Sequence, residues 1–311
     1  MQGLTIKNMI NIADDILHLQ QTGLLGQMLI DRTTRSNILW ASDEFSFLGP
    51  KFQKDGEIQP KLITGAYSGV IRTRVQKSKG QKSDRTKKHG EVFTPLWICK
   101  KMIDYADEEW FGKAAVFEKE KVEFPVNKDW KEYVDSRRLE ITCGEAPYLV
   151  SRYDVETGEE IELEQRIGIF DRKMRVVNEN AGTDEEWLKW AFRALEATYG
   201  YEFQGDSLLI ARINLFISFE EYLCKKLNRE PSKQEYGRMV KTITWNLWQM
   251  NGLTGMVPYA KTQEPQQLTI DDYLSDHFKH SEENKSECRI FDWRRGASLT
   301  YLGMKQEGTG K

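Results

Sequence analysis

Apolar residues recur at helical spacing in four parts of the chain, and each part predicts a helix. The first covers residues 7–20, and the second opens at a capping-box pattern over residues 183–186. A third covers residues 207–227. A fourth begins after a second serine-led cap and is predicted over residues 232–251.

Other apolar runs are short and predict strands. Residues 198–203 have the composition of a short buried strand, and residues 289–302 have the pattern of a hairpin that turns at Arg294, Arg295 and Gly296. Strand and helix alternate through the middle of the chain, which favours an α/β sheet. Residues 261–287 are polar and predict a loop.

The composition is that of a globular protein. The 311 residues are 39% hydrophobic and 11% aromatic, with a net charge of −3. No run approaches the roughly 20 apolar residues of a membrane helix, and the N-terminus lacks an apolar signal region, so we expect a cytoplasmic protein. Four widely spaced cysteines fit neither a disulfide framework nor a zinc site: Cys99, Cys143, Cys224 and Cys288.

Charge is unevenly distributed. Residues 72–88 hold eight cations against a single acid, Asp84, and we expect this basic segment to be exposed. It is either a solvated linker or a segment that contacts phosphates, since neutralising phosphates releases counterions and supplies non-specific affinity. The cations predicted to contact DNA are Lys77, Lys79, Lys82, Arg85, Lys87 and Lys88.

Three short motifs follow the basic segment. They are His-Gly-Glu-Val-Phe-Thr-Pro at 89–95, Leu-Glu-Ile-Thr-Cys-Gly-Glu-Ala-Pro-Tyr-Leu at 139–149 and Tyr-Gly-Tyr-Glu-Phe at 199–203. In these motifs and their order the chain resembles the N6-adenine DNA methyltransferases of restriction–modification systems, in particular the modification subunits with the gamma motif order. The resemblance implies a Rossmann-like α/β sheet that binds S-adenosylmethionine, preceded by a helical N-terminal extension.

The resemblance assigns the first two motifs to the cofactor pocket. Phe93, Thr94 and Pro95 would line it, with Pro95 starting a helix at 96–105. Glu140, Cys143 and Gly144 would form the turn after the first strand, where a helix N-terminus receives the cofactor carboxylate. Ile141, Thr142 and Ala146 depart from the family pattern, and Ala146 stands where a second glycine is expected.

The third motif supplies an acid for the ribose. The resemblance implies that Glu202 accepts hydrogen bonds from both ribose hydroxyls and that Phe203 covers the adenine. Glu202 follows Glu140 by 62 residues, whereas a simple βαβ unit places the acid about 20 residues on, so we expect an insertion at 151–182. Asp171, which ends a short apolar run, is the competing candidate.

The Asn/Asp-Pro-Pro-Tyr/Phe tetrapeptide with which the family transfers the methyl group is absent. In the family its polar side chain accepts hydrogen bonds from the target amine, and its ring stacks on a flipped base. The nearest remnant is Met-Val-Pro-Tyr at 256–259, which keeps Pro258 and Tyr259 but has methionine, a weak acceptor, at the polar position. Asp292, beside Trp293, is another candidate acceptor.

The sequence therefore predicts an N-terminal helical extension with the basic segment at 1–84, a methyltransferase-like domain at 85–260, and a C-terminal loop and hairpin at 261–311. We expect an S-adenosylmethionine-dependent adenine-N6 methyltransferase or modification subunit that acts on double-stranded DNA. A target-recognition domain is not evident, which suggests a specificity or restriction subunit as partner. The alternative is a catalytically inactive DNA-binding or regulatory subunit of the same fold.

Overall fold

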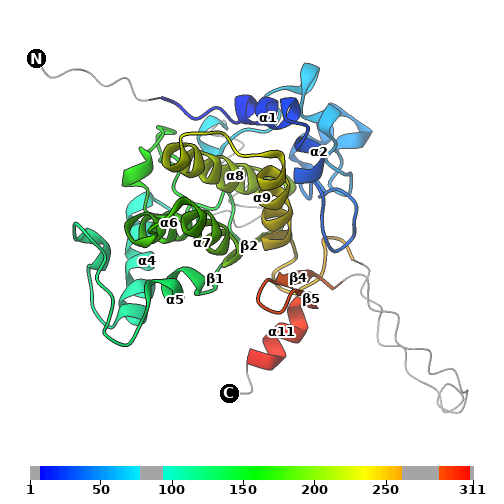
Figure 1. The fold of residues 1–311 in the computed structure, drawn as a ribbon. Coiled ribbons are helices and arrows are strands. Elements are labelled where there is room, and N and C mark those ends of the chain that lie inside the picture. The colour runs from blue at the N-terminus through cyan, green and yellow to red at the C-terminus, as the bar shows by residue number, and fades with distance from the viewer. Residues whose placement is uncertain (1–7, 78–93, 261–286, 309–311) are drawn as a thin grey trace, which may run out of the picture.

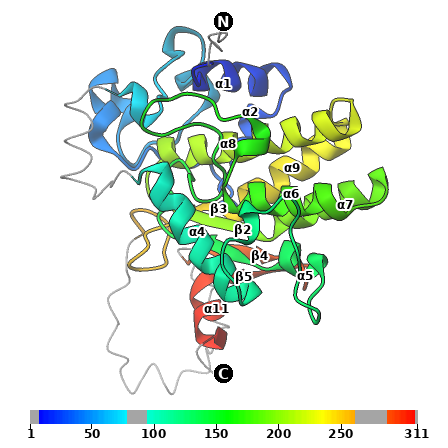
Figure 2. The same cartoon turned by 90° about the vertical axis from the view of Figure 1, so that its left-hand side faces the viewer.

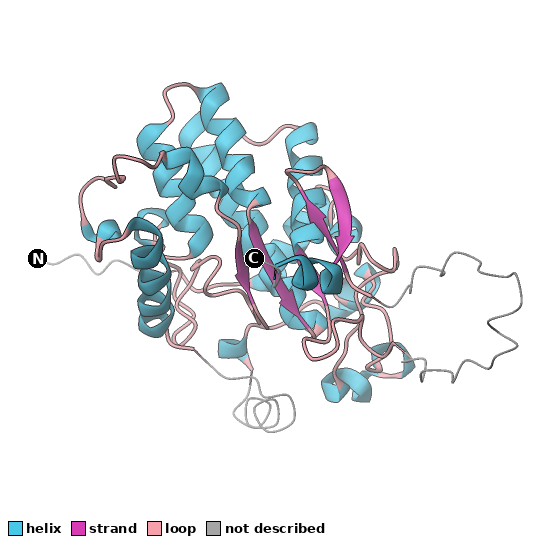
Figure 3. Ribbon diagram, turned by 90° about the horizontal axis from the view of Figure 1, so that it is seen from below, coloured by secondary structure: helices cyan, strands magenta, loops and turns pink. Residues whose placement is uncertain are grey.

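The computed structural model describes residues 8–77, 94–260 and 287–308. At its centre is a three-stranded parallel sheet in the order β1-β2-β3, formed by β1 (Arg138–Glu140), β2 (Thr198–Glu202) and β3 (Leu247–Gln249). Helices flank this small sheet, which is seen from below in Figure 3. The predicted α/β class is confirmed at this level, and β2 lies where the apolar pattern predicted a strand.

Four helices lie on one side of the sheet (Figure 1). They are α6 (Ile169–Asn180), α7 (Asp184–Glu196), α8 (Gly205–Leu227) and α9 (Lys233–Asn246). The predictions for α7 and α8 are confirmed within two residues. The hydroxyl of Thr183 caps α7 by accepting a hydrogen bond from the amide of Glu186.

The helix predicted over residues 232–251 ends earlier than expected. α9 stops at Asn246, and the next three residues form β3, which is buried throughout. A strand buried on both faces has no polar alternation, so its apolar residues cannot be distinguished from the end of an apolar helix by periodicity. The chain therefore has one more parallel strand than the sequence predicted.

The other side of the sheet is covered by C-terminal residues. The predicted hairpin is confirmed as β4 (Arg289–Asp292) and β5 (Ala297–Thr300), which pair antiparallel and lead into α11 (Tyr301–Gly308). Figure 1 shows the hairpin and α11 below the sheet. Their side chains pack on the sheet in a separate apolar cluster that includes Tyr199, Tyr201, Trp248, Met250, Ile290 and Tyr301.

The remaining helices surround this centre (Figure 2). The predicted N-terminal helix is α1 (Ile12–Gln21), followed by α2 (Leu25–Met28), while α4 (Leu96–Phe111) and α5 (Trp130–Asp135) precede β1. Short 3-10 helices occupy Asp43–Leu48, Pro50–Phe52, Pro60–Leu62, Gly65–Tyr67, Arg74–Gln76, Val116–Glu118 and Leu163–Gln165. Among the described helices, none is long and apolar enough to cross a membrane.

The N-terminal residues share the main hydrophobic core with α8. The backbone of Leu39 passes so close to Gly205 that a Cβ on this glycine would lie 1.9 Å from the Leu39 carbonyl oxygen. Deeper in the core, the buried guanidinium of Arg212 donates to the carbonyls of Met28 and Ile30, and also to the carbonyl of Leu247. The predicted domain boundaries at residues 84 and 260 remain a prediction.

Candidate functional site

The carboxyl ends of β1 and β2 bring two predicted cofactor residues to one edge of the sheet. Glu140 ends β1 and Glu202 ends β2. The Glu202 carboxylate accepts hydrogen bonds from the backbone N–H groups of Gly144 at 2.8 Å, Phe203 at 2.8 Å and Gln204 at 3.0 Å. The turn after the first strand and the acid after the second are therefore in direct contact.

The turn after β1 has unusual backbone geometry. Thr142, Gly144 and Ala146 all have positive φ angles, of 47°, 54° and 63°. Such values are rare for residues other than glycine and cost roughly 1–3 kcal/mol each, and they cluster at functional sites. Ala146 thus adopts a backbone conformation that favours glycine, at the position where the sequence analysis expected a second glycine. A Cβ on Gly144 would meet no atom within 4 Å, so the space beside its α-carbon is open.

The helix predicted directly after this turn is not formed. Residues 141–150 consist of turns, and the next α-helix along the chain is α6, which begins at Ile169. Backbone N–H groups of this turn bind the two glutamates of the edge. Leu149 donates to the Glu140 carboxylate at 3.2 Å, and Gly144 donates to the Glu202 carboxylate. The expectation of a helix N-terminus at this turn is wrong.

Burial raises the pKa of two groups of the site. The pKa of Glu140 is raised well above its usual value by burial, against the stabilising N–H groups of Tyr148 and Leu149, and the charge of Glu202 raises it further. The pKa of the Cys143 thiol is also raised well above its usual value, first by burial and then by the two glutamates. Cys143 is therefore held as a thiol and does not act as a nucleophile.

The start of α4 borders the same edge. Pro95 is the N-cap residue and α4 begins at Leu96, as predicted, although it runs on to Phe111. The Cys99 thiol donates to the carbonyl of Thr94 at 3.7 Å, and burial, reinforced by the charge of Glu140, raises the pKa of Cys99 to about 12. Thr94 therefore lies on the side of the site nearest Glu140. Phe93 is outside the described residues.

The remnant motif at 256–259 reaches this edge as well. The ring of Tyr259 lies 5.8 Å from the ring of Phe203, centroid to centroid, at an interplanar angle of 71°. Pro258 is buried, and Tyr259 is 45% exposed. The structure therefore brings Tyr259, predicted as a catalytic candidate, next to Phe203, predicted to cover the cofactor adenine.

Lys77 differs from its prediction. Its side chain is buried, and its ammonium group forms an ion pair with the Asp206 carboxylate at 2.9 Å, in the first turn of α8. Lys77 is therefore not an exposed phosphate contact, because its charge is paired with the Asp206 carboxylate inside the protein. The other predicted DNA contacts lie outside the described residues: Lys79, Lys82, Arg85, Lys87 and Lys88.

Asp292 and Asp171 also lie elsewhere. The Asp292 carboxylate accepts from the backbone N–H groups of Arg294 and Arg295 in the hairpin turn, and Arg137, which precedes β1, donates to it at 3.3 Å. Asp292 therefore belongs to the amino edge of the sheet and is not an acceptor at this site. Asp171 is in the first turn of α6, where it caps the helix from within the core, and not at the end of a strand.

Two residues that the sequence did not single out support the site. The Glu145 carboxylate accepts from the backbone amide of Arg74 at 2.6 Å and from the Tyr153 hydroxyl at 2.5 Å. Gln249, at the end of β3, donates to the carbonyls of Phe203 and Leu39. Glu145 stands inside the second motif and could have been noticed, whereas Gln249 required the recognition of β3.

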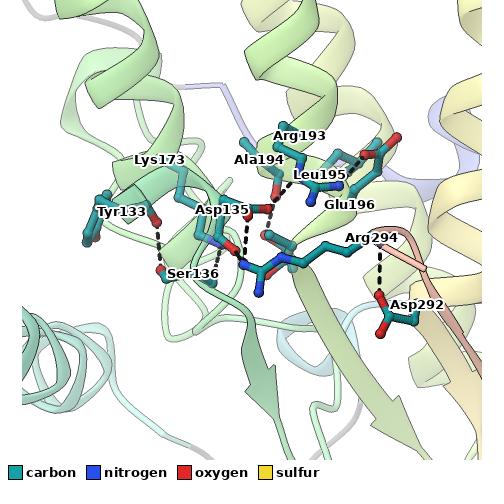
Figure 4. Close-up of polar contacts among 12 residues, drawn as sticks. Tyr133, Asp135, Ser136, Lys173, Arg193, Ala194, Leu195, Glu196, Asp292 and Arg294 are labelled. Carbon is teal, nitrogen blue, oxygen red and sulfur yellow. Dashed lines mark hydrogen bonds and ion pairs between the residues drawn. The ribbon is translucent and has the colours of Figure 1, made fainter. Parts of the chain in front are cut away.

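The amino edge of the sheet holds a second polar cluster, drawn in Figure 4. The Asp135 carboxylate is paired with Arg193 and, at 2.7 Å, with Arg294. Lys173 is 1% exposed, and its amine donates to the carbonyls of Ser136 at 2.6 Å and Ala197 at 2.9 Å. Burial, assisted by the charge of Arg138, lowers the pKa of Lys173 well below its usual value.

The described residues contain no group of three or more His, Cys, Asp or Glu side chains placed to hold a metal ion. All four cysteines are free thiols. No protein-family model matches the chain, and no curated protein and no solved structure is detectably similar to it. The fold and the site thus define a mixed α/β protein with a polar, strained site at the carboxyl edge of a parallel sheet.

Proposed function

We propose that the chain binds S-adenosylmethionine at the carboxyl edge of a Rossmann-like sheet and methylates adenine N6 in DNA, as a methyltransferase or a modification subunit of a restriction–modification system. One observation carries this proposal. The Glu202 carboxylate accepts a hydrogen bond from the backbone of Gly144, although the two residues lie 58 positions apart. Two motifs that resemble cofactor motifs thus form one site, where parallel α/β sheets bind their ligands.

The chemistry of Glu202 suits a ribose. Its carboxylate is fixed by backbone N–H groups, and such donors favour the charged form, which is the stronger acceptor for hydroxyl groups. The amino-acid part of the cofactor would then lie beside Gly144, where the space is open. Glu140, which ends β1, lies at the same edge of the sheet.

DNA is proposed as the partner because the two described residues that flank the cation-rich part of the basic segment, Lys77 and Thr94, border this site. Lys77, the last described residue before it, is paired with Asp206, four residues beyond Glu202. Thr94, the first described residue after it, accepts a hydrogen bond from Cys99, whose pKa is raised in part by the charge of Glu140. Five of the cations predicted to contact DNA stand between these two residues in the sequence.

A catalytically inactive DNA-binding or regulatory subunit is the second candidate. Its supporting observation is that Met256 stands where the family has an amide or carboxylate acceptor. Asp292, the other candidate acceptor, lies at the opposite edge of the sheet. The two candidates share the cofactor site and differ only in whether methyl transfer occurs.

Calorimetric titration with S-adenosylmethionine and S-adenosylhomocysteine tests the cofactor site. We expect micromolar binding by the wild-type protein and a loss of about 100-fold in Glu202→Gln, because two charge-assisted hydrogen bonds to the ribose are removed. Glu235→Gln is the matched control, since Glu235 also accepts a backbone N–H, from Ser232, but lies at the start of α9. Absence of wild-type binding to both ligands would refute the cofactor proposal.

Transfer of a radiolabelled methyl group to double-stranded DNA separates the two candidates. Transfer supports the enzyme, whereas cofactor binding without transfer, with and without a partner subunit, supports the inactive subunit. DNA contact is tested separately by replacing Lys82, Arg85, Lys87 and Lys88 with Ala, which should flatten the slope of log affinity against log salt by up to about 3.6. The control replaces Lys119, Lys121, Lys225 and Lys226, which removes the same charge elsewhere.

A further inference from the structure

Tyr259 is held in a strained conformation. Its φ angle is +58°, in the left-handed region that a bulky residue rarely adopts, and the ring is nevertheless 45% exposed. Within the part of the chain that the structure describes, no hydrogen bond holds its hydroxyl group. The ring, and not the hydroxyl, is therefore the feature that this conformation presents. Strain of this kind is typical of residues that clamp a ligand.

The surroundings of the ring locate it relative to Glu202. One neighbour is Phe203, the residue directly after Glu202, which meets the Tyr259 ring nearly edge to face. On the N-terminal side, the Lys54 ammonium lies 5.9 Å from the centre of the Tyr259 ring. The Tyr259 ring thus lies between Phe203, at the end of β2, and Lys54. Phe203 is the residue directly after Glu202, the acid proposed to hold a ribose.

A nucleoside fits this arrangement. Its base is joined directly to the ribose, and Phe203 directly follows Glu202, so the base of a nucleoside whose ribose binds Glu202 is within reach of the paired Phe203 and Tyr259 rings. The rings of Phe203 and Tyr259, which meet nearly at a right angle, would contact that base by stacking and by edge contacts. The two rings offer no set of hydrogen-bond donors that distinguishes one base from another, so this pair recognises a flat aromatic ring.

We propose that Tyr259, together with Phe203, forms the wall of the pocket for the adenine ring of the nucleoside ligand. This inference rests on the proposed function, because it takes Glu202 as the ribose acceptor. It also reassigns Tyr259, which the sequence suggested as a remnant of the motif that stacks on a flipped DNA base. Tyr259 is then a cofactor-binding residue and takes no part in holding the target adenine.

Two substitutions at Tyr259 separate the ring from the backbone. Tyr259→Gly removes the ring while relieving the positive φ, so the loop keeps its conformation. Tyr259→Phe keeps the ring and removes the hydroxyl. Leu253→Ala is the control, because Leu253 is 98% exposed in the same loop. Binding of S-adenosylhomocysteine and of 5′-methylthioadenosine, which lacks the amino-acid end, is measured by calorimetry, with circular dichroism to verify folding.

We expect Tyr259→Gly to weaken both ligands by the same factor, about tenfold, as for the loss of one base-stacking ring. Tyr259→Phe and Leu253→Ala should bind like the wild-type protein. Unchanged affinity of Tyr259→Gly, with wild-type binding intact, overturns this inference and leaves the proposed function standing. The same holds if only S-adenosylhomocysteine is weakened, since the contact would then be to the amino-acid end. If the wild-type protein binds neither ligand, both proposals fall.

Discussion

The two edges of the central sheet differ in how their acids are held. At the amino edge, Asp135 pairs with the side chains of Arg193 and Arg294, and Asp292 combines the side chain of Arg137 with backbone N–H groups. At the carboxyl edge, the Glu202 carboxylate is held by backbone N–H groups from two separate segments. Positive φ angles at residues other than glycine occur at the carboxyl edge, at Thr142, Ala146 and Tyr259.

The comparison bears on which edge contributes most to stability and which carries the proposed binding site. At the amino edge, the charge of Asp135 is balanced by Arg193 and Arg294, and the Lys173 amine has backbone carbonyls as hydrogen-bond partners. Backbone donors at the carboxyl edge fix the Glu202 carboxylate, and the strained turn beside it is retained despite its cost. Four predictions test this difference between the edges.

The largest effect is expected from Lys173→Met at the amino edge. Methionine fills the space but leaves the carbonyls of Ser136 and Ala197 without their donor, which should lower the free energy of unfolding by about 2–4 kcal/mol. Urea denaturation at pH 7 measures this, with Lys189→Met, an exposed lysine on α7, as the control. A loss below about 1 kcal/mol would show that the amino edge is not a stability element.

The two edges should also respond to pH with opposite sign. Lys173 has a pKa well below the usual 10.5, so the unfolded chain binds a proton that the native state lacks. Stability should therefore rise with pH towards 10.5 and fall on acidification, by up to about 1.4 kcal/mol per pH unit. Glu140 has a pKa well above 4.5, so its contribution is present below pH 4.5 and is lost as the pH rises through the folded pKa.

Difference curves isolate these two contributions. The free energy of unfolding of the wild-type protein is compared with that of Lys173→Met between pH 7 and 10, and with that of Glu140→Gln between pH 4.5 and 7. The first difference should grow with pH and the second should shrink. Parallel slopes in the two ranges would contradict a lowered pKa for Lys173 at one edge and a raised pKa for Glu140 at the other.

A smaller effect is expected from Gly144→Ala at the carboxyl edge. The added methyl group meets no atom, but the φ of +54° disfavours alanine, so the free energy of unfolding should fall by about 1 kcal/mol. Gly237→Ala is the control, because Gly237 lies in α9 with open space and no positive φ, and alanine should stabilise it by about 0.5–1 kcal/mol. Equal shifts in thermal unfolding would argue against strain in the turn.

The smallest effect is expected from Arg294→Ala. The Arg294 side chain is 42% exposed, and Asp135 keeps its second partner, Arg193, when the Arg294 guanidinium is removed. Exposed ion pairs contribute little, so we expect a change of about 0.5 kcal/mol or less in urea denaturation and no change in ligand affinity. A loss comparable to that of Lys173→Met would mean that the ion pairs and Lys173 form one cooperative unit.

Local sequence signals predicted much of the fold. Caps and apolar periodicity locate α7 and α8, and the apolar run at 198–203 locates β2, because each is encoded by its own residues. β3 has only three residues and directly continues an apolar helix, so no local signal separates it. The strained backbone at Ala146 is equally invisible, since alanine ordinarily avoids that conformation.

The site was predicted in part for the same reason. The resemblance of the motifs pointed to Glu140, Gly144 and Glu202, which lie at one edge of the sheet. Lys77 was misassigned because its partner, Asp206, is 129 residues away and nothing near Lys77 indicates burial. Long-range pairing of this kind is decided by the tertiary fold, so a cluster of cations in the sequence cannot reveal which of its members is internal.

The guanidinium of Arg212 has a consequence for how the chain is made. Its partners at Met28 and Ile30 lie 184 and 182 residues earlier, and its contact at Leu247 comes 35 residues later. During synthesis, the N-terminal segment leaves the ribosome long before the residues that fix it exist. Contacts of such long sequence separation form late and slowly. The first helices of a nascent chain therefore gain these contacts only after most of the domain has emerged.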